Sequence, residues 1–152
     1  MLYLSRVPKQ SILDRNAYQF FVTASEDGQP LWTNDIQQKG PVFQDPLGVG
    51  WNVSVSYNTG LKRYLLCTEH NRSHLAHLGI FDAPEPWGPW TTVAYEDAWG
   101  DGHVPLDTFY WSFPTKWISS NGQAFTMIFT GRSTNDSLNT LRGRFRLRNG
   151  ED

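Results

Sequence analysis

Cysteine is nearly absent from this sequence, since Cys67 is the only one in 152 residues. A single cysteine excludes an intrachain disulfide and any cysteine-based metal cluster. Charged residues are also scarce, at 18% of the chain, below the quarter that is usual in globular proteins. With a formal net charge of −2, the chain lacks the basic footprint of a nucleic-acid-binding domain, so no nucleic-acid partner is expected.

Long apolar runs are absent as well. No stretch approaches the roughly 18 residues that a membrane-spanning helix needs, so no membrane partner is expected. The first residues, Met1–Arg6, lack the apolar core of a signal peptide, and we therefore expect a cytoplasmic protein. We also expect no bound cofactor.

Aromatic residues, in contrast, are abundant: they make up 14% of the chain, and seven residues are tryptophan. Flat rings fill the space between packed sheets well, so this composition favours layered β-structure. Exposed rings would instead serve as platforms on which sugars or bases stack. The length of 152 residues suits one domain with a real core, and we expect residues 1–152 to form a single domain.

The clearest β-pattern predicts four strands, at 53–57, 63–68, 75–81 and 90–95. Val53–Tyr57 alternates apolar and polar side chains, as a half-buried strand does, and Gly60 lies in the hairpin turn that follows. A connector rich in proline, Asp82–Trp90, joins the last two strands and cannot be helical. Residues 53–95 thus have the size and order of one complete β-propeller blade.

The flanking segments look like incomplete copies of this unit. Residues 109–148 predict three strands, and residues 3–43 resemble the outer half of a blade. The only helix expected is one turn over Ile12–Arg15 with Ser11 as its N-cap. The predicted fold class is therefore all-β, built from antiparallel four-stranded meanders and amounting to about half of a five-bladed propeller.

Three segments carry a resemblance to a known family: Val53–Leu66, Gly79–Trp90 and Pro114–Trp117. They resemble the C-terminal part of five-bladed propellers related to glycoside hydrolases. Arabinanase-type and β-fructosidase-type enzymes are the characterised members, beside a large uncharacterised group to which this chain is most similar. The resemblance covers most of the chain and is specific mainly to the fold. Short chains of this kind also look like products of environmental gene cassettes.

The related enzymes use two carboxylates near the propeller axis, and their separation decides whether configuration at the sugar is inverted or retained. The resemblance implies that these carboxylates lie mainly in earlier blades. The strands that would line the axis here, Gly50–Asn58 and Phe109–Ile118, contain no aspartate or glutamate. Glu69, beside His70 at a strand end, is the best remaining catalytic candidate, as a general acid. The alternative is that Glu69 is a carboxylate solvated at the end of its strand.

Two other acidic features are expected to be structural. Asp82 is predicted to cap the proline-rich connector by accepting hydrogen bonds from backbone amides. An acidic loop offers oxygen ligands for calcium but matches no EF-hand spacing, so an ordinary surface loop is favoured. Its carboxylates are Glu96, Asp97, Asp101 and Asp107.

Three histidines, His70, His74 and His77, suggest a metal site. A spacing of four residues puts His70 and His74 on one face only in a helix, whereas this segment is expected to be a loop that leads into a strand. Zinc needs further ligands in a fixed geometry, so no metal site is predicted. His103 is the better candidate for ligand binding, because the resemblance implies a histidine near the central channel.

Four further residues lie in or beside the strands that would line the axis and are predicted to bind a ligand: Trp51, Ser54, Tyr110 and Lys116. Aromatic faces with a few polar groups suit carbohydrate, because the C–H faces of a sugar stack on indoles. Trp87 and Trp90 are instead expected to pack against neighbouring units. For Trp51 and Tyr110 both packing and binding stay open.

Four arginines alternate with other residues along the last predicted strand: Arg142, Arg144, Arg146 and Arg148. They indicate either an anion-binding patch or a charged edge that prevents aggregation between sheets. A third alternative follows from the incomplete flanking units. The last strand and the N-terminal half-blade would complete one another between two chains, in a homodimer.

The leading functional hypothesis is a non-catalytic propeller-type module of glycoside-hydrolase-like ancestry that binds carbohydrate. The second hypothesis is a glycosidase whose active site is assembled between two chains, with Glu69 or a carboxylate of the acidic loop as its acid. The third is a structural or interaction protein that has no small-molecule ligand.

Overall fold

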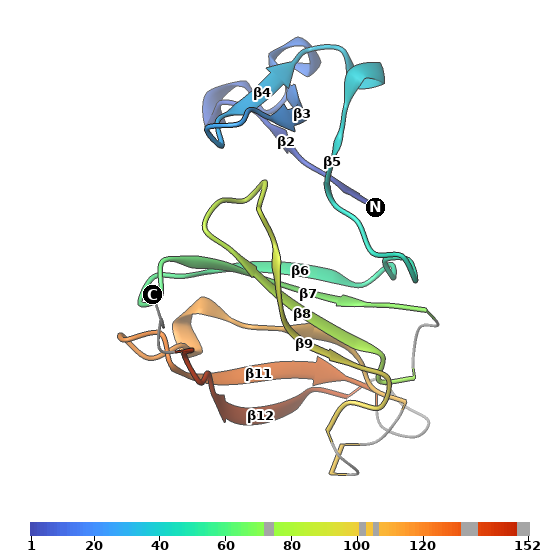
Figure 1. Ribbon diagram of the computed structural model, residues 1–152, viewed down its shortest axis with the longest axis vertical. Helices are drawn as coiled ribbons and strands as arrows, with labels where there is room; N and C mark the ends of the chain where they lie inside the picture. The colour runs from blue at the N-terminus through green and yellow to red at the C-terminus, as the bar shows by residue number, and fades with distance from the viewer. Residues whose placement is uncertain (72–74, 101–102, 105–106, 132–136, 149–152) are drawn as a thin grey trace.

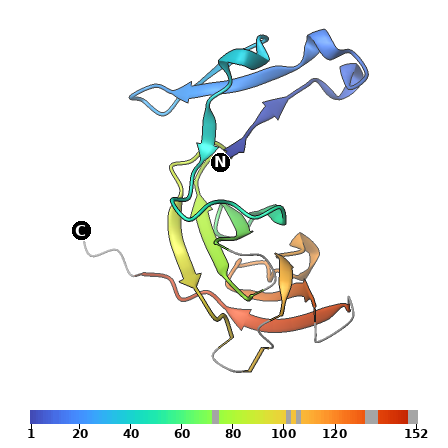
Figure 2. The ribbon, with the colours of Figure 1, turned by 90° about the vertical axis from the view of Figure 1, so that its right-hand side faces the viewer.

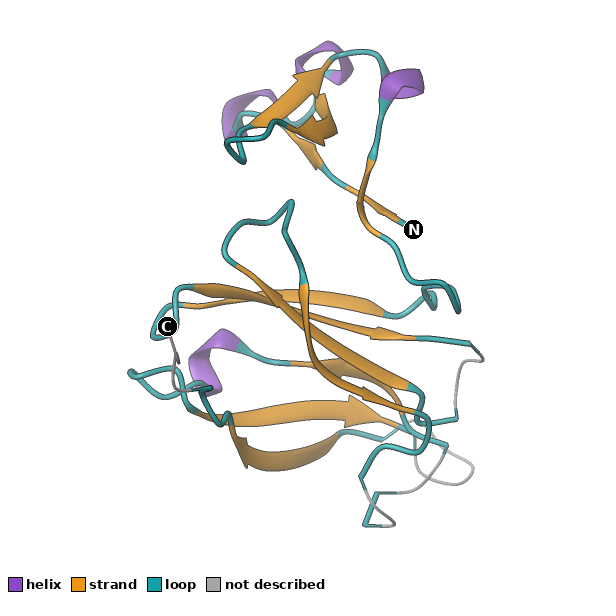
Figure 3. Ribbon diagram, viewed as in Figure 1, coloured by secondary structure: helices purple, strands orange, loops and turns teal. Residues whose placement is uncertain are grey.

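A computed structural model describes residues 1–71, 75–100, 103–104, 107–131 and 137–148. The described strands pair antiparallel in four sheets (Figures 1 and 3), which confirms the all-β class. The helical segments of this part of the chain are turns of three residues. None of them is long and apolar enough to cross a membrane.

The central sheet has the strand order β6-β7-β8-β9. Its strands are β6 (Val53–Asn58), β7 (Arg63–Glu69), β8 (Leu78–Ala83) and β9 (Thr91–Glu96). These are the four strands that the sequence predicts between residues 53 and 95, with small shifts at their ends. Both β7 and β8 are almost entirely buried, whereas most of β9 is exposed. The central sheet therefore needs a cover on each face.

The N-terminal residues form two small sheets that are mostly pale to dark blue in Figure 1. One pairs β1 (Leu2–Tyr3) with β5 (Pro41–Phe43). The other has the order β2-β3-β4, made of β2 (Ser5–Arg6), β3 (Gln19–Ala24) and β4 (Pro30–Thr33).

The C-terminal sheet has the order β10-β11-β12, made of β10 (Phe109–Ser112), β11 (Ala124–Thr130) and β12 (Asn139–Arg144). The strand predicted over 109–118 stops at Ser112, because Pro114 starts a 3-10 turn, η4 (Thr115–Trp117). Arg142 and Arg144 are exposed along β12, and Arg146 and Arg148 are exposed just beyond its end.

The prediction of one helical turn capped by Ser11 is wrong. Ser11 ends the 3-10 turn η1 (Lys9–Ser11), because Pro8, with φ −59°, starts the turn earlier in the chain. Two further turns, η2 (Arg15–Ala17) and η3 (Ile36–Gln38), follow aspartates. The side chain of each aspartate accepts a hydrogen bond from a backbone N–H of its turn.

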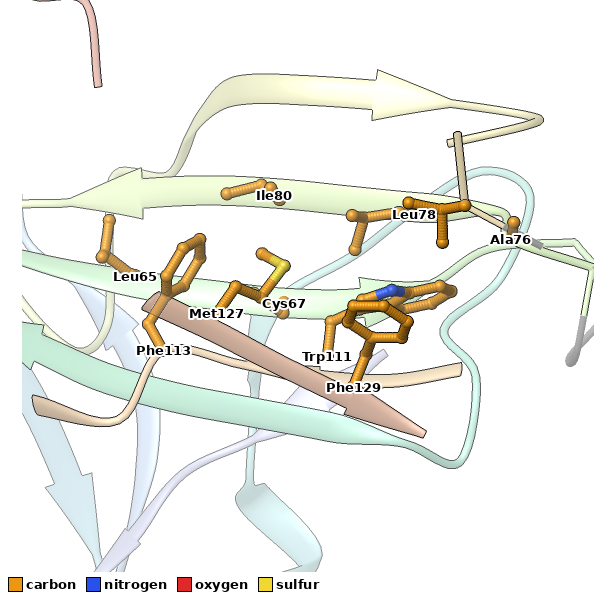
Figure 4. Close-up of a cluster of buried hydrophobic side chains, with 10 residues drawn as sticks. Leu65, Cys67, Ala76, Leu78, Ile80, Trp111, Phe113, Met127 and Phe129 are labelled. Carbon is orange, nitrogen blue, oxygen red and sulfur yellow. The ribbon is translucent and has the colours of Figure 1, made fainter. Parts of the chain in front are cut away.

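The central sheet lies between the C-terminal sheet and the N-terminal part of the chain (Figures 1 and 2). Its face toward the C-terminal sheet carries the larger core, in which Leu65, Cys67, Leu78 and Ile80 meet Trp111, Phe113, Met127 and Phe129 (Figure 4). Burial raises the pKa of the Cys67 thiol to about 12, so this cysteine is an inert core residue. On the other face Phe43 packs against Leu66 and Phe81.

The proline-rich connector between β8 and β9 contacts the N-terminal part of the chain. Trp87 lies edge-on to Trp32 with ring centroids 6.3 Å apart, and its Nε1 donates to the Gly28 carbonyl over 3.1 Å. Trp90 lies edge-on to Phe43, also at 6.3 Å. The expectation that both indoles pack against a neighbouring unit is confirmed.

Asp82 does not cap the connector through backbone amides, so that prediction is wrong. Its carboxylate forms an ion pair with Arg63 Nε at 2.6 Å and accepts a hydrogen bond from the Thr91 hydroxyl. Thr91 in β9 lies directly opposite Asp82. Because side chains on paired strands are close neighbours, Asp82 binds them and not the backbone amides of the connector.

Two turns from different sheets meet where Gly60 approaches Gly122. Asn58 is fully buried here, and its Nδ2 donates to the Gly122 carbonyl over 2.8 Å. A Cβ atom at Gly60 would lie 2.2 Å from the Gly122 nitrogen and 2.3 Å from the Asn121 carbonyl carbon. Backbone therefore meets backbone at this point, without room for a side chain.

We expect Gly60→Ala to lower the free energy of unfolding by about 3 kcal/mol, because the added methyl group must push one turn away from the other. Gly28→Ala is the control, since a Cβ there meets nothing within 4 Å and adds only the cost of its φ of +79°, about 1 kcal/mol. Urea unfolding curves of both variants measure the difference. Equal destabilisation by the two substitutions would contradict a close contact between the turns.

Candidate functional site

Strands β6 and β10, which come from different sheets, contact each other along one edge of the layered structure. The Ser54 hydroxyl donates to the Trp111 carbonyl over 2.8 Å and so joins the two strands. Through this bond Ser54 links the central sheet to the C-terminal sheet. Its predicted role in ligand binding stays a prediction.

Aromatic rings are exposed at one end of this β6–β10 edge. Trp51 precedes β6 and keeps 71% of its surface accessible, and Tyr110 in β10 keeps 52%. The Trp51 ring lies 6.5 Å from the ring of Phe109, the residue before Tyr110. We call Trp51, Phe109 and Tyr110 the aromatic edge.

The backbone at Tyr110 is strained, with φ at +60° in the left-handed region. The pairing of β10 with β11 is irregular between Phe109 and Ser112, so Tyr110 lies within this irregularity. Strained residues of this kind concentrate at functional sites. Tyr110 is therefore the residue of the aromatic edge whose backbone conformation points to a functional role.

Glu69 is buried, with 1% of its surface exposed, so the alternative of a solvated strand-end carboxylate is wrong. Its Oε2 accepts a hydrogen bond from Asn52 Nδ2 over 3.1 Å, and Gly50 lies against it, leaving no room for a Cβ. Asn52 is buried as well. The predicted role of Glu69 as a general acid stays a prediction.

The two remaining predicted residues do not join the aromatic edge. His103 is exposed and lines a cavity of about 280 Å³ beside Gly131 and Phe129. Lys116 lies in η4, with its Nζ 5.4 Å from the centroid of the Trp117 ring. Trp51, just before the start of β6, lies beside Phe109, whereas Asn58, the last residue of β6, contacts Gly122 in the turn that follows η4. The 3-10 turn η4 therefore lies toward the opposite end of β6 from the aromatic edge.

A second group of polar side chains lies at the ends of β7, β8 and β9. Potential metal-ligand atoms of His70, His77 and Asp97 all lie within 4.8 Å of one another. Burial lowers the pKa of His70, and this effect outweighs the nearby Asp45 carboxylate, which raises it. His70 is therefore neutral at pH 7. The sequence pattern groups His70 and His77 with His74 and places Asp97 in a separate acidic loop; His74 and Asp101 lie outside the described residues.

A groove of about 610 Å³ opens between the segment after β5 and strands β8 and β9. Trp90 and Tyr95 line it together with Asp45. The Tyr95 hydroxyl donates to Asp45 over 2.9 Å, and burial beside this carboxylate raises the pKa of Tyr95 to about 12. None of the residues predicted to bind a ligand lines this groove.

The chain matches no protein-family model, and a search of curated proteins finds no match either. Its function must therefore be argued from the residues and their arrangement.

The strain at Tyr110 predicts an unusual order of stability. Tyr110→Gly and Tyr110→Ala both remove the ring, but only glycine adopts a positive φ without a steric cost, so we expect the glycine variant to be more stable by about 0.5–1 kcal/mol. Tyr3, an exposed tyrosine of β1 without a positive φ, is the matched control, where the alanine variant should be the more stable. Thermal unfolding of the four variants measures both differences, and the same order at both positions would contradict strain at Tyr110.

Proposed function

We propose that the chain is a non-catalytic, propeller-type module that binds carbohydrate at the aromatic edge. The exposed indole of Trp51 is the observation that carries this proposal, since a ring with 71% of its surface accessible contributes little to a core. Sugar rings stack on such indoles through their C–H faces. Tyr110, exposed on the adjacent strand and strained in its backbone, would provide a second ring surface.

A non-catalytic role is supported by the positions of the carboxylates. Strands β6 and β10, which border the proposed site, contain no aspartate or glutamate. The nearest acid on a neighbouring strand, Glu69, is buried and bonded to Asn52. General acid catalysis needs a carboxyl group within hydrogen-bonding reach of the glycosidic oxygen, which a buried Glu69 does not meet.

Propeller ancestry is supported by the way the sheets stack. In a propeller, four-stranded antiparallel sheets pack face to face around an axis, with their first strands innermost. Here the central sheet packs face to face on the C-terminal sheet, and their first strands, β6 and β10, contact each other. On this proposal the β6–β10 edge is the part of the axis that one chain supplies.

The test is binding of soluble polysaccharides, measured by isothermal titration calorimetry with arabinan, levan and dextran. We expect saturable binding of at least one of them, and a loss of about tenfold in affinity for Trp51→Ala, since a stacked ring contributes on the order of 1.4 kcal/mol. Tyr3→Ala is the control, because it removes an exposed ring from the β1–β5 pair and should leave affinity unchanged.

Absence of binding to all three polysaccharides, or equal affinity of wild type and Trp51→Ala, would reject the aromatic edge as a carbohydrate site. A reducing-sugar assay on the same samples addresses the glycosidase hypothesis. Release of sugar that disappears in Glu69→Gln would favour an enzyme over a binding module.

We further propose that two chains associate through the last strand and the N-terminal sheet. Among the described residues, β12 pairs only with β11, and its exposed arginines follow its free edge. The N-terminal sheets and their turns carry four exposed acidic side chains, Asp14, Glu26, Asp27 and Asp35, beside four exposed basic ones, Arg6, Lys9, Arg15 and Lys39. Pairing between copies would satisfy the backbone groups of the strand edges that stay unpaired within one described chain.

Light scattering coupled to size exclusion tests this association. We expect the mass of a dimer at micromolar concentration in low salt, and a shift toward the monomer for Arg142→Glu/Arg144→Glu, because the reversed charges would lie beside the carboxylates of the N-terminal part instead of pairing with them. Lys62→Glu, which reverses a single charge on the β6–β7 turn, is the control. A monomer mass for the wild type across the concentration range would contradict the proposal.

A further inference from the structure

His70, His77 and Asp97 lie in one row across three strands. Glu69 in β7 pairs with Leu78 in β8, and Leu78 pairs with Glu96 in β9. One position beyond these pairs, the same register places His70 opposite His77 and His77 opposite Asp97. The backbone N–H of His70 donates to the backbone carbonyl of His77 over 3.2 Å, so the strand pairing continues to this row. Directly opposed residues share a face of the sheet, with Cβ atoms about 5 Å apart.

The hydrogen bonds of the two imidazoles determine which nitrogen keeps its lone pair. His70 Nε2 lies 3.1 Å from the Glu96 carbonyl, and His77 Nδ1 lies 3.2 Å from the His70 carbonyl. A carbonyl only accepts, so each of these nitrogens carries a hydrogen. In the neutral imidazole the other nitrogen then keeps its lone pair, which is Nδ1 in His70 and Nε2 in His77. Metal-binding histidines typically have this arrangement, in which the second ring nitrogen donates to a carbonyl.

Among the described residues, the lone pair on His70 Nδ1 has no hydrogen-bond partner, although it is buried. The residue keeps 1% of its surface exposed, and no described group donates a hydrogen bond to its Nδ1. The Asp97 Oδ1 lies 3.9 Å from this nitrogen, but a carboxylate oxygen cannot donate to a lone pair. A buried acceptor without a donor costs about 1–3 kcal/mol. A cation between these two atoms would remove that cost.

The surroundings hold the His70 ring in place and are negatively charged. Tyr95 stacks on the His70 ring with centroids 3.9 Å apart, and its hydroxyl is bonded to Asp45. Asp45, Asp97 and Glu69 all contribute negative charge near His70. The Asp97 side chain is 81% exposed and so is free to move the short distance toward a shared ion.

We propose that His70, His77 and Asp97 bind a divalent transition-metal ion of the zinc type. Two imidazole nitrogens and one carboxylate suit zinc, nickel or cobalt, whereas calcium and magnesium prefer oxygen ligands alone. Three protein ligands leave a coordination position for water, and the exposed Asp97 puts that position at the surface. The ion would join the ends of β7, β8 and β9 and stabilise this end of the central sheet.

Zinc binding to the purified full-length chain, treated with EDTA and dialysed, tests the proposal by isothermal titration calorimetry. We expect one zinc ion per chain, and a loss of at least tenfold in affinity for both His77→Ala and Asp97→Asn, because each removes a ligand. Zinc should also raise the melting temperature of the wild type and leave that of the variants nearly unchanged. The cobalt complex of the wild type should show visible absorption bands that both variants lose.

Two controls separate this site from surface binding. Glu96→Gln changes the exposed carboxylate next to Asp97, and His103→Ala removes an exposed histidine outside the row, so both should bind zinc as the wild type does. Neither His77 nor Asp97 is fully buried, and thermal melts without metal check that the variants fold. An isotherm without a saturable one-to-one site, or equal zinc affinity of the wild type and His77→Ala, would overturn the proposal.

Discussion

The structure depends on one constraint, which is that the central sheet is apolar on both faces. Strands β7 and β8 are buried along most of their length, with Leu65 and Cys67 facing one way and Leu66 and Phe81 the other. A sheet of this kind is stable only between two covers. The C-terminal sheet covers one face with large aromatic side chains. The N-terminal part covers the other through Phe43, and the tryptophans of the connector extend that contact.

Both proposed sites lie where this cover ends. The aromatic edge follows β6 and β10, where two stacked sheets present neighbouring edges to solvent. His70 and His77 lie one residue beyond the assigned ends of β7 and β8, where a last backbone hydrogen bond from His70 to His77 extends the pairing. The core therefore positions the strand ends, and the chemistry of each site comes from the residues at those ends.

The strands of the central sheet could be predicted because their signal is local. Val53–Tyr57 alternates, Gly60 marks a turn, and prolines mark the connector, so each boundary is encoded within a few residues. The helical turns were harder to predict. Pro8 and Asp14 precede the two turns in this segment, so neither turn begins after Ser11. The histidine row could not be found by spacing along the chain. His70, His77 and Asp97 are brought together by pairing between strands. The spacing of His70 and His74 along the chain, which matters only in a helix, gives no information about that pairing.

The sequence by itself determined the all-β class, the four strands of the central sheet and the packing role of Trp87 and Trp90, because periodicity, turn residues and prolines act over short distances. Only the tertiary structure decided the environment of each polar residue. Burial depends on which other segments cover a residue, so Glu69 is enclosed although its place at a strand end suggested that it could be solvated. Asp82 likewise binds side chains on two neighbouring strands, which its position in the sequence does not show. Tertiary packing likewise left Trp51 exposed while it buried Trp111, although both are tryptophans at neighbouring edge strands.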